Sequence, residues 1–196
     1  LRDAAYELGG GNCESVNYTC ATSDQELLME NEILLFGEDL PELKQDTSFA
    51  RIVFLRTDAA DNFEGEEELY RFVRELEYVR YHIFPKGYMV RTSAKSSREQ
   101  ARVSKDAIGA GINFERLGSA YIRKYLKNPR VRNVQVLFLT GMKELEPFLK
   151  EAQQTDAVTG ALNHILQGMP MNCKTCDLKT ICDEVDGMRS LHKKNR

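Results

Sequence analysis

The stretch Val131-Arg-Asn-Val-Gln-Val-Leu-Phe-Leu-Thr140 decides the fold class of this 196-residue chain. From Val134 to the last leucine, Gln135 is the one polar residue, and such a run predicts a β-strand buried on both faces. Helical patterns flank it: Asn113 can cap a helix on its N-terminal side, and residues 143–164 are helical in tendency on its C-terminal side. We therefore predict an α/β fold with helices packed on a sheet, with α+β as the alternative.

Segments further from this strand extend the pattern. Residues 64–84 are expected to form the clearest helix, because their apolar residues recur at steps of three and four. Residues 13–22, which follow three glycines, are expected to form a loop. The remaining expectations are strands over 32–36, 50–55, 88–90 and 100–103, short helices after Ser104 and over 183–192, and an interruption of the C-terminal helix at Gly160. Together these elements predict a small mixed sheet of roughly three to five strands.

Composition narrows the class of protein. The chain is 42% hydrophobic and 29% charged, which is ordinary for a globular protein. Its formal net charge is −3, so overall charge gives no support for binding to nucleic acid or to an anionic membrane. No apolar run reaches the length of a membrane span. We therefore expect neither nucleic acid nor a membrane as a partner.

Three of the five cysteines are concentrated in the segment Cys173-Lys-Thr-Cys176-Asp-Leu-Lys-Thr-Ile-Cys182. A Cys-x2-Cys turn lets two thiolates converge on one metal centre, and the third cysteine can return to it. A [4Fe–4S] cluster is the first candidate, zinc is the alternative, and reduced thiols without a metal are the third interpretation. Cysteines in this pattern, odd in number and without a hydrophobic leader, are typical of a reducing cytoplasm.

Both kinds of metal centre usually take four ligands, so a further ligand has to come from elsewhere in the chain. Cys13 or Cys20 is the first candidate for this fourth ligand, and His164 and His192 are further candidates. The predicted organisation is an α/β domain over residues 1–168, followed by a metal-binding tail with a short helix over residues 169–196.

Several segments, in order, resemble the middle domain of acetyl-CoA synthase, the β subunit of the carbon monoxide dehydrogenase/acetyl-CoA synthase complex. They are Arg102-Val-Ser-Lys-Asp-Ala-Ile-Gly-Ala-Gly-Ile112, then Glu115-Arg-Leu-Gly118 through Tyr125, then Val134-Gln-Val-Leu-Phe-Leu-Thr140. The likeness extends more weakly to Ala5–Leu8 and to Ile33–Leu40. The resemblance implies the fold of that domain, a role in acetyl-CoA and one-carbon metabolism, and subunits of the complex as partners.

The resemblance also bears on the metal. In the family, a Cys-x2-Cys after this domain supplies two ligands to the [4Fe–4S] part of a nickel-iron-sulfur cluster, and Cys173 and Cys176 occupy the corresponding place. This favours iron-sulfur over zinc. Cys182 departs from the family, where the gap is longer, and the chain lacks the Cys-Gly-Cys that holds the distal nickel there. We therefore expect an acetyl-CoA synthase-like protein that is not catalytically complete alone.

The family's middle domain is further implicated in holding CoA through arginines and a tryptophan. The chain contains no tryptophan, so the adenine-stacking part does not transfer. Arg91, Arg98 and Arg102, near Lys95 and Lys105, form a basic patch in the sequence that suits the phosphates of CoA. A solvated loop with ordinary surface charge is the alternative.

A second functional hypothesis is an independent iron-sulfur or zinc module that serves electron transfer or partner docking. The chain shows no nucleophile-and-base set and no Rossmann fingerprint, so we predict no catalytic residue. His82 is expected to act as a charge at the end of a helix.

Overall fold

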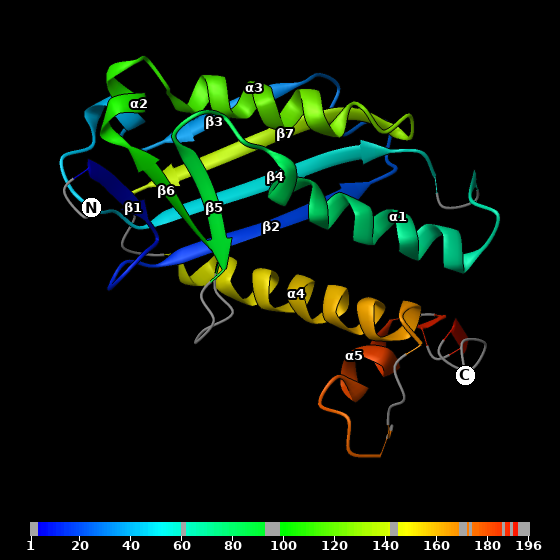
Figure 1. Cartoon of the computed structure of the whole chain (residues 1–196). Coiled ribbons are helices and arrows are strands. Elements are labelled where there is room, and N and C mark those ends of the chain that lie inside the picture. Colours follow the sequence, from blue (N-terminus) through cyan, green and yellow to red (C-terminus); the bar gives the residue numbers. More distant parts are fainter. Residues whose placement is uncertain are drawn as a thin grey trace.

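The computed structural model describes residues 4–59, 62–92, 99–141, 145–168, 172, 174–185, 187–188 and 190–191. Figure 1 shows two sheets with helices around them, which confirms the predicted α/β class. The strands are β1 (Ala5–Leu8), β2 (Ser15–Thr22), β3 (Glu32–Phe36), β4 (Phe49–Thr57), β5 (Tyr88–Thr92), β6 (Glu99–Ser104) and β7 (Val131–Thr140). The α-helices are α1 (Glu66–Tyr78), α2 (Lys105–Gly109), α3 (Phe114–Tyr125), α4 (Glu146–Leu166) and α5 (Lys179–Glu184), and the 3₁₀ turns are η2 (Leu40–Glu42) and η4 (Val79–His82).

Strand β7 has the bounds predicted from the sequence and lies inside the larger sheet. That sheet has the order β2-β4-β7-β3, in which β7 runs antiparallel to β4 and parallel to β3. Val134, Val136 and Phe138 are fully buried on one face of the strand, and Leu139 is buried on the other. The alternation of side chains along a strand assigns these residues to the two faces.

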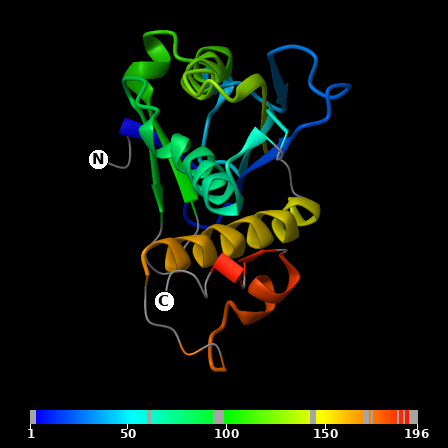
Figure 2. The same cartoon turned by 90° about the vertical axis from the view of Figure 1, so that its right-hand side faces the viewer.

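Two layers cover this sheet, one on each face. Helices α1 and α3, together with the small antiparallel sheet β1-β6-β5, bury the inner face in the main core. The N-terminal half of α4 packs on the opposite face, over Val16 and Tyr18 of β2 and Ala50 and Ile52 of β4. In the turned view of Figure 2 the long helix α4 crosses below the sheets.

Three expectations about individual elements were wrong. Residues 15–22 form β2 rather than a loop, because they pair in parallel with β4 along their whole length. Helix α4 runs through Gly160 without an interruption. The last predicted helix, over 183–192, is not continuous: α5 covers Lys179–Glu184 and ends before Val185, which is extended, whereas the described residues 188, 190 and 191 are helical.

The larger sheet is mixed and has four strands, in agreement with the predicted mixed sheet of three to five strands. The second sheet was not predicted: β1, β5 and β6 pair with one another instead of joining the larger one. Their register places Val103 of β6 between Tyr6 and Tyr88. Val103 and Tyr88 are buried in the main core, so the small sheet packs over the inner face of the larger sheet.

Helix α3 is held at its first turn by polar caps from two parts of the chain. The side chain of Asn113, the predicted cap, accepts a hydrogen bond from the backbone N–H of Arg116 at 2.9 Å. Asp39 Oδ1 accepts one from the backbone N–H of Phe114 at 2.9 Å, across 75 residues of sequence. These bonds satisfy donors that a helix start leaves unpaired and fix α3 over β3 and β7.

The described part of the tail packs on the C-terminal half of α4 and on α1. Met188 and Leu191 are buried beside Leu162, Ile165 and Tyr70. The division into a domain over 1–168 and a tail over 169–196 stays a prediction. Among the described residues, no helix is both long enough and apolar enough to cross a membrane.

Candidate functional site

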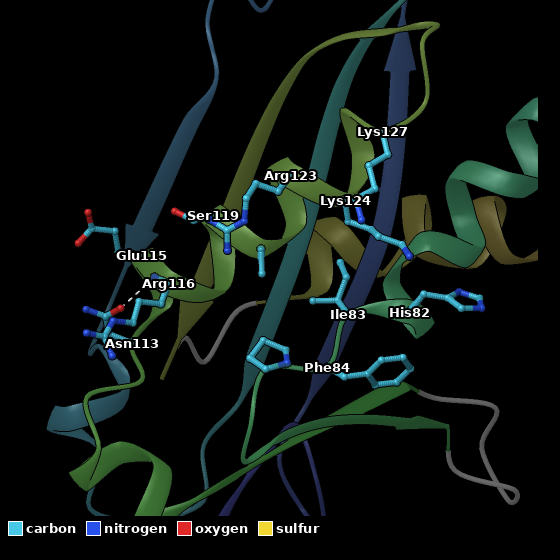
Figure 3. Close-up of a pocket in the computed structure, with 12 residues that line it drawn as sticks. His82, Ile83, Phe84, Asn113, Glu115, Arg116, Ser119, Arg123, Lys124 and Lys127 are labelled. Carbon is cyan, nitrogen blue, oxygen red and sulfur yellow. Dashed lines mark hydrogen bonds between the residues drawn. The ribbon is translucent and has the colours of Figure 1, made fainter.

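A basic groove runs along the exposed side of α3, which we call the α3 groove (Figure 3). Its volume is about 860 Å³, within the range of small-molecule sites. It lies between α3 and the segment that joins η4 to β5. The lining residues are His82, Ile83, Phe84, Pro85, Asn113, Glu115, Arg116, Ser119, Ala120, Arg123, Lys124 and Lys127.

The local sequence explains both walls of the groove. Helix α3 buries Leu117, Tyr121 and Tyr125 in the core, and the opposite side of the helix, which carries Arg116 and Arg123, is exposed. On the opposite wall, Ile83 is 4% exposed and anchors the segment, while the next residue, Phe84, is 77% exposed. The aromatic ring of Phe84 is therefore exposed to solvent at the edge of a polar groove.

The groove concentrates positive charge on a chain of net negative charge. Arg116, Arg123, Lys124 and Lys127 line it, against one acidic residue, Glu115. Arg116 and Arg123 differ by seven residues, or two helical turns, which places them on the same side of α3, and Lys127 lies in the turn that follows the helix. In Figure 3 the Lys124 side chain extends from α3 toward the segment carrying His82 and Phe84. The arrangement suits a ligand with several phosphate groups.

The basic patch predicted from the sequence is arranged differently. Arg91 Nη2 lies 2.6 Å from Glu7 Oε2, and Arg102 Nε lies 3.3 Å from Glu7 Oε1. One carboxylate thus joins β5 and β6 to β1 and offsets the charge of both arginines. Arg98 lies outside the described residues. The α3 groove is therefore the better anion site among the described residues, and sequence reasoning missed it because its cations are spread along an ordinary amphipathic helix.

The structure also contains a buried ion-pair network that the sequence analysis did not predict. It consists of Arg51, Glu77, Arg80 and Glu99, all at most 8% exposed. Arg80 pairs with both carboxylates at 2.7 Å, and Arg51 Nη2 lies 3.3 Å from Glu99 Oε1. Burial disfavours the charge of Arg51, but neighbouring groups, Tyr121 and Glu99 foremost, outweigh it and raise its pKa. The network ties β4, β6, η4 and α1 together.

Glu77 in this network has a perturbed acidity. Its Oε1 accepts a hydrogen bond from the backbone N–H of Thr19 at 3.1 Å, and its Oε2 accepts one from Arg80 at 2.7 Å. Burial raises its pKa above the usual value, and the charge of Arg80 opposes that rise. The carboxyl group lines a cleft of about 280 Å³ between β2, α1 and α4. Since both oxygens are engaged by the protein itself, we assign Glu77 a structural role.

The predicted metal ligands are distributed over three regions. Cys176 lies just before α5 and Cys182 lies within it, and both are half-buried. Cys182 packs against the apolar cluster that α4, α1 and the tail form. Cys20 lies on β2 and packs under α4, and Cys13 lies in the turn between β1 and β2. Cys173 and His192 lie outside the described residues.

Among the described residues, no group of three or more His, Cys, Asp or Glu side chains is arranged to hold a metal ion. His164 is in the last turn of α4. The described tail therefore contributes the two thiols of Cys176 and Cys182, and the third predicted thiol belongs to a residue whose place is not described.

Comparisons with known proteins add no assignment. A scan against protein-family models and a search of curated proteins find no match to this chain. The residues of the chain and their geometry are therefore the basis on which a function can be proposed.

Proposed function

We propose that this chain is a ligand-binding module of acetyl-CoA synthase type, which holds a phosphate-bearing ligand in the α3 groove. CoA is the candidate ligand, because the sequence resemblance leads to it. One observation carries the proposal: four cationic side chains line a groove beside an exposed aromatic ring. CoA has charged phosphates and a flat adenine ring, which match these two features.

The chemistry assigned to each wall differs. Arg116 and Arg123 present planar guanidinium groups, which bind phosphate oxygens through two parallel hydrogen bonds. Lys124 and Lys127 add point charges that can follow a flexible ligand. Phe84 offers a face on which an adenine can stack, with no tryptophan required. No residue of the groove is given a catalytic role, so the proposed activity is binding.

Isothermal titration of the whole chain with CoA tests the proposal. We expect binding that weakens with added salt, because the contacts are largely ionic. Pantetheine, which lacks the phosphates and the adenine, should bind at least about a hundredfold more weakly, because each charged hydrogen bond contributes ~1.5–3 kcal/mol. Absence of CoA binding would remove the proposal.

Substitutions locate the site. Arg123→Ala and Lys127→Ala should each reduce CoA affinity about tenfold through loss of a charged contact. Lys44→Ala removes an exposed lysine outside the groove and serves as the control. If Arg91→Ala abolishes binding while the groove variants leave it unchanged, the ligand lies at the small sheet instead.

For the tail we propose a metal centre held by Cys173, Cys176 and Cys182, with a [4Fe–4S] cluster preferred over zinc. Two observations support this centre. The first is the cysteine spacing, and the second is the packing of the described tail against α4 and α1, which holds Cys182 in place. A bound cluster would supply an electron-transfer centre. Cys13 or Cys20 remains the proposed fourth ligand.

Iron, sulfide and zinc analysis of anaerobically purified protein separates the metal hypotheses. We expect about four irons and four sulfides per chain for a cluster, and loss of both in Cys176→Ser and Cys182→Ser. A result of one zinc per chain would support a structural zinc site instead of a cluster. Protein that contains no metal would refute both metal hypotheses. We further propose subunits of the carbon monoxide dehydrogenase/acetyl-CoA synthase complex as partners, a cytoplasmic location, and dependence on other subunits for any catalysis.

A further inference from the structure

Strand β3 ends the larger sheet and has one open side. Among the strands of the described residues, it pairs with β7 alone, in the order β2-β4-β7-β3. Alternate residues of a strand direct their N–H and C=O groups to the same side. The side of β3 away from β7 thus presents a row of backbone donors and acceptors to which another strand can add. We call the stretch from Met29 to Glu38 the β3 edge.

The β3 edge carries apolar side chains where most sheet edges carry charge. Phe36 is 56% exposed and Met29 is 73% exposed, and Leu27 just before them is 53% exposed. Phe36 lies opposite Leu139 and Leu34 opposite Leu137 in the register with β7, so they share one face of the sheet. Helix α4 packs on the β2 side of that face, which leaves the β3 side for an added segment.

Acidic residues frame these apolar side chains. Glu30 and Glu32 are exposed at the start of β3, and Glu38 is exposed just beyond its end. Along the β3 edge, the apolar side chains are therefore flanked by acidic residues at both ends. A partner strand that pairs with the backbone and complements this face has apolar residues at its centre and basic residues towards both ends.

The same charges disfavour a second copy of this chain as the occupant. Two identical strands related by a two-fold axis run antiparallel. Glu30 and Glu32 of one copy would then lie beside Glu38 of the other, and like charges opposite each other destabilise a strand pair. We propose that the β3 edge binds an extended basic segment of a partner protein by strand addition.

A peptide with valines at its centre and lysines towards both ends, labelled with a fluorophore, serves as the probe against the full chain. We expect saturable binding by anisotropy and shifts of the β3 backbone amides in ¹⁵N spectra. N-methylation of alternate peptide amides, which removes the donors along one edge, should abolish binding. The variant Glu30→Lys/Glu38→Lys should weaken binding about tenfold, whereas Glu75→Lys, at an exposed site on α1, should leave it unchanged.

Several outcomes overturn the proposal. Failure of the peptide to bind, or binding that survives N-methylation, excludes strand addition by a basic segment. Equal binding of a glutamate-valine peptide removes the charge argument. A dimer in sedimentation, with β3 amides protected from exchange, assigns the edge to a second copy. None of these outcomes depends on CoA, so they are separate from the test of the α3 groove.

Discussion

Replacing Glu99 with glutamine tests whether the buried ion-pair network holds the fold together. The substitution keeps the size of the side chain and removes its charge. Glu99 lies 2.7 Å from Arg80 and 3.3 Å from Arg51, and Arg51 is fully buried. In the variant Arg51 loses its carboxylate partner and keeps the face of the Tyr121 ring, 5.1 Å from its guanidinium carbon.

The expected loss follows from burial. Removing one partner of a buried ion pair leaves a charge without compensation and costs ~3–5 kcal/mol. A loss of that size is a large share of the ~5–15 kcal/mol that stabilises a typical domain. The matched control is Glu67→Gln, whose partner Arg71 lies at 2.7 Å but whose pair is more than half exposed. That change should cost at most ~0.5 kcal/mol.

Urea unfolding, followed by far-ultraviolet circular dichroism, measures both free energies, with equal m-values as the condition for comparing them. The double variant Arg51→Met/Glu99→Gln supplies the decisive arm. Since it removes the uncompensated charge and leaves the Arg80–Glu77 pair, it should be more stable than Glu99→Gln alone. A loss below ~1 kcal/mol for Glu99→Gln, or a double variant less stable than it, would refute the reasoning.

Three further predictions concern single residues. Gly118→Ala should destabilise the fold by ~1–3 kcal/mol, because the added Cβ would lie 2.7 Å from Ile33 Cγ1. Its control, Gly160→Ala, adds a Cβ that meets nothing within 4 Å and should stabilise α4 by up to ~1 kcal/mol. Chemical denaturation measures the sign of both changes. Burial raises the pKa of Glu77. The stability that Glu77 contributes is therefore fully present below the ordinary glutamate pKa and is lost as pH rises through the raised pKa. In thermal melts from about pH 4 to pH 7, Glu77→Gln should make the decrease of stability with pH smaller. Burial also raises the pKa of the Cys20 thiol, so iodoacetamide should modify it more slowly than N-acetylcysteine at about pH 8; equal rates by mass spectrometry would contradict this.

Local patterns were sufficient where burial follows the sequence period. The continuous apolar run of β7 identified a strand with the observed bounds, and Ser104 and Asn113 cap α2 and α3 as predicted. These features depend on residues within one or two turns of each other. Their physical causes, side-chain alternation and the unpaired N–H groups of a helix start, can be read locally.

Strand β2 shows a local pattern that the prediction overlooked. Val16, Tyr18 and Cys20 alternate with polar residues in Ser15–Thr22, which is the period of a half-buried strand. It becomes a strand because β4 offers a parallel partner for every residue and α4 covers Val16 and Tyr18. The local alternation thus indicates a strand, whereas the choice of β4 as its parallel partner, more than thirty residues away in the sequence, was made by tertiary contact.

The sites divide in the same way. The cysteine spacing, the absence of tryptophan and the cations of α3 are properties of the sequence alone. Which cations stay available for a ligand was decided by folding, because Glu7 reaches Arg91 and Arg102 across the small sheet while no carboxylate pairs with Arg123 among the described residues. Charge and hydrophobicity are local, so the sequence determines the kinds of element and the chemistry on offer. Burial and ion pairing depend on distances between segments far apart in the chain, and the tertiary structure alone sets those distances.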